Sequence, residues 1–372
     1  MNKWTFPTQI YAGPDSLNRL TEFNNESILI ICDPFLKDSP SLTYVMGLMD
    51  SRNKVTIYTD VVPDPPITHV VKGIEFMEGI KPSVIIAIGG GSCIDMSKGI
   101  AYFGRKLKQM DIKSFIAVPT TSGTGSEVTS FAVLTDSETQ IKYPLVDDAV
   151  LPDEALLTPL FVKTSPPSVT AFSGMDVLVH ALESYVATAA NNFTDALVQQ
   201  AIELVFEYLP KCHKPTATEQ DRMSMHEASC LAGLSFNKAG LGIVHAMAHQ
   251  LGGQFHVPHG LANSMLLPYV IGFNCSRNQE VAKKYAHLSA KLGFASYKSS
   301  DGDKLGALLE AIVKLQRTLE CPMTLTEFGV DKATSEAKLD LMADRALEDM
   351  CYRFNPYPAN HSDLVGLYKK VL

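Results

Sequence analysis

An aspartate and several histidines in this sequence stand at spacings that suit a metal site. Two pairs have members four residues apart, which places both side chains of a pair on one face of a helix. Both pairs lie in otherwise apolar segments, where an unpaired carboxylate or imidazole would be costly. One carboxylate with imidazoles from different helices can hold a divalent transition metal and leave a coordination position open. We therefore predict a metal site; spacing leaves open which groups bind among the candidates Asp176, His180, His245, His249, His256 and His259.

A glycine-rich turn at residues 89–92 is the first sign of a second site. It reads Gly-Gly-Gly-Ser and joins an apolar run to a helical pattern that starts near Ile94. Glycines let the backbone approach a ligand closely, and a helix N-terminus offers free N–H groups to a phosphate. A tight turn capped by Ser92 would need one glycine rather than three, so we favour a phosphate-binding turn. The pattern departs from the G-x-G-x-x-G fingerprint and is weak by itself.

A second loop, at residues 119–127, follows the next apolar run and consists of small, turn-forming residues. In open α/β sheets ligands bind outside the carboxyl ends of the strands. The loop hydroxyls that suit phosphate or carboxamide oxygens belong to Thr120, Thr121, Ser122 and Thr124. Asp33, at the end of the first predicted strand, could accept hydrogen bonds from ribose hydroxyls and repel a 2′-phosphate, although a turn role before Pro34 explains it equally well. The two loops together indicate a dinucleotide site.

Two kinds of element must position these groups. Short runs rich in Ile and Val alternate with helix-length segments up to about residue 150, which predicts a parallel, Rossmann-like sheet covered on both faces. After about residue 165 the apolar residues recur at helical spacing and β-branched runs become rare. We therefore predict an α/β dinucleotide-binding domain at residues 1–165 and an all-α metal-binding domain at residues 166–372. The active site is expected in the cleft between them.

The composition excludes several classes of protein. The net charge of −8 argues against nucleic acid as a partner, because phosphates require a basic face. The apolar runs are too short for a membrane span, and the N-terminal residues lack the apolar stretch of a signal peptide. Seven scattered cysteines form no C-x-x-C pair, which is typical of a reducing compartment; Cys93, beside the glycine turn, is the candidate for thiol modification. We expect a cytoplasmic protein with neither nucleic acid nor membrane as partner.

Hydride transfer is the reaction that best explains a dinucleotide site in one domain and a buried metal in the other. The metal would polarise the carbonyl, the nicotinamide would carry the hydride, and a nearby histidine would pass a proton to solvent. A metal-dependent hydrolase would use the same ligands but leaves the glycine loops unexplained. A metal- and NAD-containing lyase of the dehydroquinate synthase type would use both sites without net redox change. A binding module without catalysis fits worst, because it needs neither site.

Five segments of the chain resemble the iron-containing, group III alcohol dehydrogenases, and the resemblance runs over almost the whole sequence. They are GGGSCIDMSK (89–98), PTTSGTGSEVT (119–129), GMDVLVHALE (174–183), AGLGIVHAMAHQLGG (239–253) and VPHGLAN (257–263). Within that family, residues 141–145 and 254–259 look most like the 1-propanol dehydrogenases of propanediol-utilisation microcompartments. Two positions depart from the family pattern. Thr158 stands where many members have aspartate, so we expect a local cap to be lost, and Tyr357 stands where many have arginine.

The resemblance implies roles for particular residues. The family's metal ligands correspond to Asp176, His180, His245 and His259, which leaves His249 as a proton-relay candidate lining the site. The implied cofactor-binding residues are Asp33, Asp64, Gly90, Gly91, Ser92, Asp95, Thr120, Thr121, Thr129 and Lys142. In this family an acidic residue at position 33 goes with NAD(H) rather than NADP(H).

The resemblance also implies the metal, the substrate and the assembly. It implies Fe²⁺, with Zn²⁺ as the alternative, and a homodimer formed partly through residues 4–11. The expected reaction reduces a small aldehyde to a primary alcohol, propionaldehyde to 1-propanol, and regenerates NAD⁺. Ethanol and lactaldehyde/1,2-propanediol are the alternative substrates. A place inside a bacterial microcompartment, with its shell proteins as partners, is the alternative to the open cytoplasm.

Overall fold

The computed structural model describes residues 4–136 and 141–372, and the side chains of residues 141 and 142 lie outside this description. The chain forms two compact units. The first comprises Met1–Ser165 and Arg222–Leu234, and the second comprises Pro166–Asp221 and Ser235–Leu372. Among the described helices, none is long and apolar enough to cross a membrane. The cleft expected between the two domains stays a prediction.

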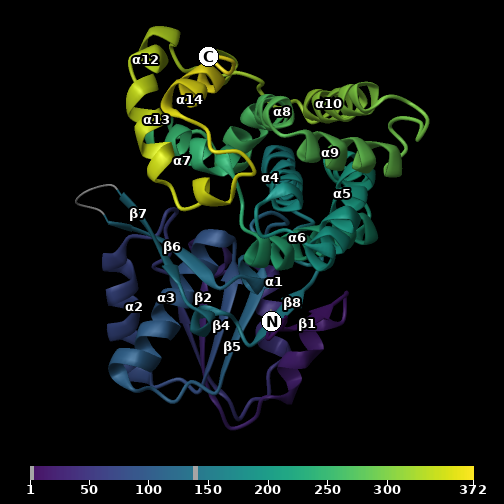
Figure 1. The fold of residues 1–372 in the computed structure, drawn as a ribbon. Coiled ribbons are helices and arrows are strands. Elements are labelled where there is room, and N and C mark those ends of the chain that lie inside the picture. Colours follow the sequence, from purple (N-terminus) through teal and green to yellow (C-terminus); the bar gives the residue numbers. More distant parts are fainter. Residues whose placement is uncertain (1–3, 137–140) are drawn as a thin grey trace. The chain divides into compact units, whose positions relative to one another are not determined.

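A six-stranded sheet forms the centre of the first unit (Figure 1). Its strands, in spatial order, are β1 (Gln9–Ala12), β8 (Glu154–Leu157), β5 (Ser114–Pro119), β4 (Val84–Gly89), β2 (Ser27–Cys32) and β3 (Lys54–Tyr58). The pairings that join them are parallel. The register pairs Gly89 with Pro119 and Cys32 with Ile88. The glycine turn, the second loop and Asp33 therefore leave three neighbouring strands at the same edge of the sheet.

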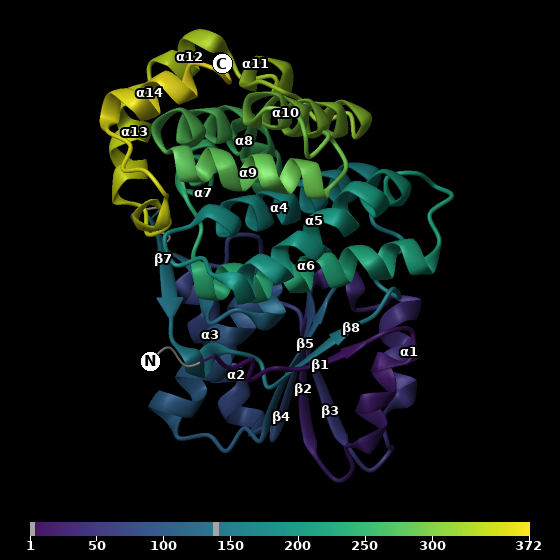
Figure 2. The ribbon, with the colours of Figure 1, turned by 45° about the vertical axis from the view of Figure 1, so that its right-hand side comes forward.

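Both faces of this sheet are buried, because successive residues of a strand point to opposite sides. Ile85 of β4 enters a core with the helices on one face, whereas Ile86 enters a separate core on the other face. Figure 2 shows α2 and α3 on one side of the sheet and α1 on the other. These helices are α1 (Pro40–Leu48), α2 (Ile67–Ile80) and α3 (Gly91–Lys108). The predicted parallel sheet with two covered faces is confirmed.

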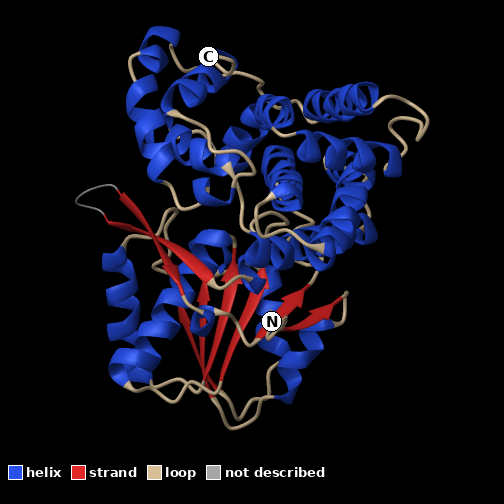
Figure 3. Ribbon diagram, in the orientation of Figure 1, coloured by secondary structure: helices blue, strands red, loops and turns tan. Residues whose placement is uncertain are grey.

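An antiparallel hairpin accompanies the parallel sheet (Figure 3). It consists of β6 (Phe131–Asp136) and β7 (Ile141–Val146). Helix α3 anchors the start of the hairpin, because the ammonium of Lys98 donates a hydrogen bond to the carbonyl of Phe131 at 2.8 Å. The sequence patterns did not predict this hairpin, since its strands lack a continuous Ile/Val run.

The second unit is helical, as predicted. Its helices are α4 (Pro167–Val186), α5 (Asn192–Cys212), parts of α6 (Glu219–Ala239), α7 (Ile243–Phe255), α8 (His259–Arg277), α9 (Gln279–Lys291), α10 (Asp301–Thr318), α11 (Leu325–Phe328), α12 (Lys332–Glu336), α13 (Leu339–Glu348) and α14 (His361–Tyr368). Helix α4 is buried along its whole C-terminal half. Polar side chains in that half must therefore find partners inside the protein.

The middle of α6 belongs to the first unit, although we predicted residues 166–372 to form one domain. Met223 and Cys230 of this segment pack with Val128, directly after the second loop, and with Ala155 and Leu157 of β8. Gly125 of the second loop has φ +61° and comes so close to α6 that a Cβ there would lie 2.7 Å from the Cα of Gly233. Two glycines thus let the loop backbone rest directly on the helix.

Candidate active site

Four side chains of the second unit converge on one point. Asp176 and His180 come from consecutive turns of α4, His245 from the first turn of α7, and His259 is the first residue of α8. One ligand atom of each lies within 4.8 Å of the others. Oδ1 of Asp176 is 3.8 Å from Nε2 of His245 and 3.6 Å from Nε2 of His259, and Oδ2 is 3.9 Å from Nε2 of His180. The side chain of His259 is 42% exposed while the other three are buried, so the cluster is accessible from one side.

The donor set of this cluster fits a divalent transition metal. Three imidazole nitrogens and one carboxylate are the ligands that zinc and iron take in proteins. Burial and the neighbouring histidines lower the pKa of His245 well below its ordinary value, so this imidazole is neutral and can offer a lone pair. Ring stacking fixes the orientation of His180, whose ring centroid lies 4.4 Å from that of Phe236 and 4.7 Å from that of His245.

Asn263 lies against the cluster, and the sequence patterns gave it no role. Its Nδ2 donates to Oδ1 of Asp176 at 2.7 Å and lies 3.1 Å from Nε2 of both His245 and His259. The side chain is fully buried, one turn after His259 on α8. Asn263 therefore fixes the rotamer of Asp176 and keeps α8 in register with α4.

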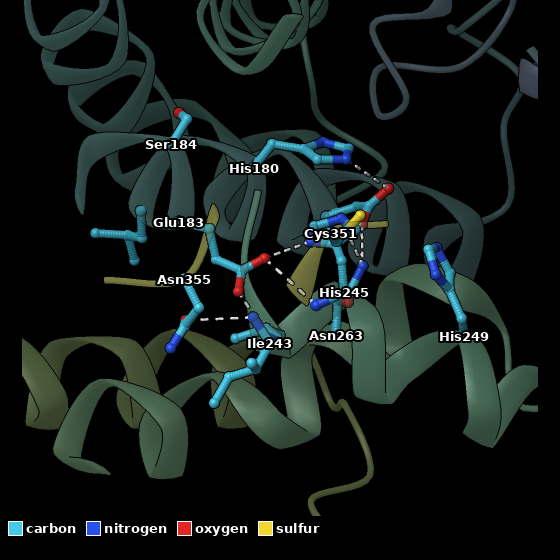
Figure 4. A network of polar contacts seen from close by, with 12 residues as sticks. His180, Glu183, Ser184, Ile243, His245, His249, Asn263, Cys351 and Asn355 are labelled. Atoms are coloured by element: carbon cyan, nitrogen blue, oxygen red, sulfur yellow. Dashed lines mark hydrogen bonds and ion pairs between the residues drawn. The ribbon is translucent and has the colours of Figure 1, made fainter. Parts of the chain in front are cut away.

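Glu183 approaches His245 from the side opposite to the cluster (Figure 4). Its Oε2 lies 2.6 Å from Nδ1 of His245, and its Oε1 accepts a hydrogen bond from the backbone N–H of Val244 at 2.7 Å. Burial raises the pKa of Glu183 to about 8, although the backbone N–H groups at the start of α7 act in the opposite direction. A cation in the neighbouring cluster would favour the ionised carboxylate.

The C-terminal segment closes the same helix end. Asn355 is buried, and its Oδ1 accepts hydrogen bonds from the backbone of Ile243 at 3.3 Å and from Nδ2 of Asn274 at 3.1 Å. Tyr357, at the position that departs from the family pattern, packs edge-on against Phe273. The guanidinium of Arg277 lies over the ring of Tyr357. The C-terminal segment thus anchors the start of α7.

His249 lies beside the cluster and is oriented by a second carboxylate. Nδ1 of His249 is 2.7 Å from Oδ2 of Asp349, and Oδ1 of Asp349 accepts from the backbone N–H of Cys351 at 2.9 Å. Burial acts to raise the pKa of Asp349, but His249 and the Cys351 N–H outweigh it, so that the pKa is lowered. The ring of His249 stacks on that of His259 with centroids 5.4 Å apart. His256, by contrast, is exposed at the end of α7 and does not join the cluster.

The glycine turn of the first unit forms the N-terminus of α3. The N-cap residue is Gly90 rather than Ser92, and no side chain caps it, so the first N–H groups of this long helix are not used by a capping side chain. A Cβ on Gly91 would lie 2.7 Å from Cγ2 of Thr124, and a Cβ on Gly90 would lie 3.6 Å from Cγ2 of Thr121. The two predicted loops therefore contact each other, which fits a phosphate-binding edge.

Asp33 points at the glycine turn. Its Oδ2 accepts a hydrogen bond from the backbone N–H of Gly90 at 3.2 Å, and it makes no capping bond to the short helix that begins at Pro34. Burial raises the pKa of Asp33, while the Gly90 N–H opposes this effect. The structure therefore does not use the Asp33 side chain for the turn before Pro34 and places it at the candidate dinucleotide edge.

Asp95, which is half-buried, and Thr129, which is buried, make hydrogen bonds within this edge. Asp95 accepts hydrogen bonds from Oγ of Ser126 at 2.6 Å and from the backbone of Val133 at 2.9 Å. Thr129 is fully buried, and its hydroxyl lies 3.1 Å from Nζ of Lys98. Their role as cofactor contacts stays a prediction, and their described partners show that both also support the second loop.

The remaining cofactor candidates are distributed unevenly. Thr120 is buried and Thr121 is half-buried, both directly after β5. Asp64 is exposed, with a positive φ of 49°, in the connection before α2. The side chain of Lys142 lies outside the described residues.

The sequence patterns missed a contact between the second loop and α6. Oγ of Ser122 lies 3.2 Å from Nδ1 of the buried His226, and burial lowers the pKa of His226 to about 4. The cap that we expected to be lost at Thr158 is present, because its hydroxyl accepts from the backbone N–H of Leu160 at 3.3 Å. Cys93 is fully buried and burial raises the pKa of its thiol well above the ordinary value, so the hypothesis of a readily modified thiol is wrong.

Comparison with known proteins identifies the family. The profile of iron-containing alcohol dehydrogenases matches residues 7–159, and the profile of the C-terminal region of the Fe-containing alcohol dehydrogenase family matches residues 170–372. This chain belongs to the iron-containing alcohol dehydrogenase family. The first match contains both loops of the dinucleotide edge and the second contains the whole metal cluster. The resemblance to this family that the sequence motifs indicated is therefore confirmed. Membership makes the protein a dehydrogenase and implies a bound metal and a nicotinamide nucleotide.

Individual members of the family align with this alcohol dehydrogenase over its whole length. The 1-propanol dehydrogenase PduQ of Salmonella typhimurium is 42% identical over 372 residues, which cover 100% of both chains. The NADPH-dependent butanol dehydrogenase of Clostridium saccharobutylicum is 37% identical and covers 100% of this chain and 98% of its own. The crystal structure of a 1,3-propanediol oxidoreductase matches with a TM-score of 0.92 at 31% identity, with 100% of both chains covered.

Proposed function

We propose that this alcohol dehydrogenase uses NAD(H) and a divalent cation, natively Fe²⁺, to interconvert small primary alcohols and aldehydes, with propionaldehyde reduction to 1-propanol as its main reaction. The observation that carries the proposal is the cluster of Asp176, His180, His245 and His259. Its donors come from three helices and face one point, and one side is accessible. The 42% identity to a 1-propanol dehydrogenase supports the choice of substrate.

The four cluster residues would hold the cation, and His249 would exchange the proton. A divalent cation at this position would polarise the substrate oxygen, and NADH would supply the hydride. Asp349 lies 2.7 Å from Nδ1 of His249, which leaves Nε2 as the atom that gives a proton to the substrate oxygen or takes it back. The stacking of His249 on His259 keeps that nitrogen beside the cluster.

NAD(H), rather than NADP(H), is proposed because of the carboxylate of Asp33 at the glycine turn. The family includes an NADPH-dependent butanol dehydrogenase, so membership alone does not choose the cofactor. Replacement Asp33→Gly removes the charge that would repel a 2′-phosphate, and we expect a rise of at least about tenfold in the ratio of kcat/KM with NADPH to that with NADH. An unchanged ratio would reject the assignment, and metal content should not change.

The decisive experiment combines metal analysis with a substrate panel. Protein purified without oxygen is analysed for bound cations and then assayed with NADH, Fe²⁺ and C2–C4 aldehydes. The proposal predicts a bound divalent ion and fastest NADH oxidation with propionaldehyde. Faster turnover of acetaldehyde or lactaldehyde would select the alternative substrates, whereas cofactor retention without net NADH turnover would favour the lyase. The absence of any bound divalent ion, or full activity of His259→Ala, would refute the metal-dependent mechanism.

A homodimer is also part of the proposal. Strand β1 lies at one end of the strand order, and an edge strand offers unpaired backbone groups to a second copy. Phe6 and Ile10 beside that edge are 47% and 39% exposed. Light scattering of the purified protein tests the dimer directly. The cytoplasm, with a bacterial microcompartment and its shell proteins as the alternative, stays a prediction from the resemblance.

A further inference from the structure

Glu183 links the metal cluster to the start of helix α7. We propose that Glu183 is a positioning residue for the metal site, because its carboxylate holds His245 with Nδ1 protonated and Nε2 turned to the cluster while it anchors the first turn of α7. The inference rests on the proposed metal-dependent function. Its test measures metal binding rather than turnover.

The spacing on α4 places Glu183 on the same face as two cluster residues. Asp176, His180 and Glu183 stand at positions i, i+4 and i+7, which line up over two turns of a helix. All three are at least nine-tenths buried, with exposures of 3%, 4% and 5%. A buried carboxylate requires specific partners, and Glu183 finds them at the start of α7, where one of them is the cluster residue His245.

The start of α7 lacks a capping side chain of its own. Its N-cap residue is Gly242, and no side chain of that residue can accept from the first turn. The carboxylate of Glu183 accepts from the backbone N–H groups of Val244 at 2.7 Å and His245 at 3.3 Å. An acidic group at a helix N-terminus is favourable both as an acceptor and toward the helix dipole. Glu183 therefore fixes the backbone that carries His245.

The same carboxylate controls the imidazole of His245. Oε2 lies 2.6 Å from Nδ1. The ionised carboxylate, which a cation in the cluster favours, therefore keeps the proton on Nδ1 and leaves a lone pair on Nε2. Nε2 is the nitrogen that lies 3.8 Å from Oδ1 of Asp176 in the cluster. The opposite tautomer would direct an N–H at the cation position. Carboxylates behind metal-binding histidines act in this way, and their loss costs metal affinity.

Gly242 supplies an independent observation for this close approach. A Cβ at this position would lie 2.7 Å from Oε1 of Glu183 and 2.8 Å from Oδ1 of Asn355. Two acceptor side chains therefore approach one backbone position, and a larger residue there would have to displace both of them. Asn355 accepts from Ile243 and exchanges hydrogen bonds with Asn274, and none of these bonds reaches a residue of the metal cluster. This difference from Glu183 provides a matched control.

The experiment compares Glu183→Gln with Asn355→Ala in the full-length protein. A glutamine at position 183 keeps one acceptor oxygen but cannot accept from both the α7 backbone and Nδ1 of His245. We expect metal-free Glu183→Gln to bind Zn²⁺ about 10- to 100-fold more weakly in competition with a chromophoric chelator, and its Co²⁺ complex to show an altered absorption spectrum. Asn355→Ala should lower the unfolding midpoint while it changes Zn²⁺ affinity by less than about threefold.

Three outcomes overturn the inference. The first is wild-type Zn²⁺ affinity with an unchanged Co²⁺ spectrum in Glu183→Gln. The second is a loss of Zn²⁺ affinity in Asn355→Ala as large as that in Glu183→Gln, which would mean that Glu183 acts only as a helix cap. The third outcome applies if Glu183→Gln does not fold, and it uses Glu183→Asp. The shorter side chain should weaken Zn²⁺ binding at least about fivefold, and wild-type Zn²⁺ affinity would refute the positioning role of Glu183. A wild-type protein that binds neither Zn²⁺ nor Co²⁺ would refute the proposed function itself, a result distinct from these three.

Discussion

The contact between α8 and α4 at Gly260 predicts a large effect from one methyl group. Gly260 follows His259, and a Cβ at this position would lie 2.0 Å from the backbone oxygen of Phe172 and 3.1 Å from the Cβ of Asp176. The obstructing atom is backbone, so it cannot rotate away as a flexible side chain would. Replacement Gly260→Ala must therefore move the start of α8 away from α4, with His259 on the moving part and Asp176 on the other helix.

The size of this displacement can be estimated from contact distances. A carbon and a carbonyl oxygen seldom approach below about 3.3 Å, so a contact of 2.0 Å demands a shift of about 1.3 Å. Metal–ligand distances tolerate about 0.2 Å. We therefore expect metal affinity to fall at least about tenfold, or about 1.4 kcal/mol. Overpacking costs about 1–3 kcal/mol, and the helix gain from glycine to alanine offsets about 0.5–1 kcal/mol of it, so the metal-free protein should lose up to about 2.5 kcal/mol of stability.

Gly272 on the same helix provides the matched control. A Cβ there meets nothing within 4 Å, so Gly272→Ala should stabilise the protein by about 0.5–1 kcal/mol and leave metal affinity unchanged. Urea unfolding of the metal-free variants measures stability, and Zn²⁺ titration against a chromophoric chelator measures affinity. If Gly260→Ala and Gly272→Ala behave alike in both assays, the close contact between α8 and α4 does not position the metal ligands and the reasoning fails.

Two further predictions concern the first unit. Gly91→Ala would place a Cβ 2.7 Å from Cγ2 of Thr124 and separate the two loops; NADH affinity, followed by fluorescence, should fall about tenfold, while Gly79→Ala, which meets nothing within 4 Å, should retain it. A wild-type NADH affinity in Gly91→Ala would count against the phosphate-binding edge. Burial lowers the pKa of His226 from 6.5 to about 4, so the unfolded chain takes up a proton first, and about 3 kcal/mol of stability present above pH 6.5 should be lost as pH falls toward 4. Urea unfolding across this range should show a flatter pH dependence for His226→Gln, and parallel curves for the two proteins would contradict the assignment.

The sequence predicted the parallel sheet because continuous Ile/Val runs, such as residues 84–88, can be buried on both faces. It did not predict the hairpin of β6 and β7, whose residues carry a weaker strand pattern than those runs. It placed residues 222–234 in the helical domain because periodicity identifies a helix without saying what the helix packs against. The contact of Gly125 with Gly233 groups that segment with the first unit.

In the candidate site, too, sequence patterns predicted some features and only the structure showed the others. Helical spacing alone brought Asp176 and His180 to one face of α4, and turn chemistry alone marked the glycine-rich edge after β4. Periodicity reports which face of an element a residue occupies, over a few turns of chain. It carries no information on partners farther away, such as Glu183 behind His245, Asp349 beside His249, and Asn355 at the start of α7. The sequence by itself therefore determined the fold class and the kinds of chemistry available. Spacing left open which histidines share a point, and the family resemblance named them. The tertiary structure brings those histidines together and shows which carboxylates orient them, because these contacts arise from helix packing between segments far apart in the chain.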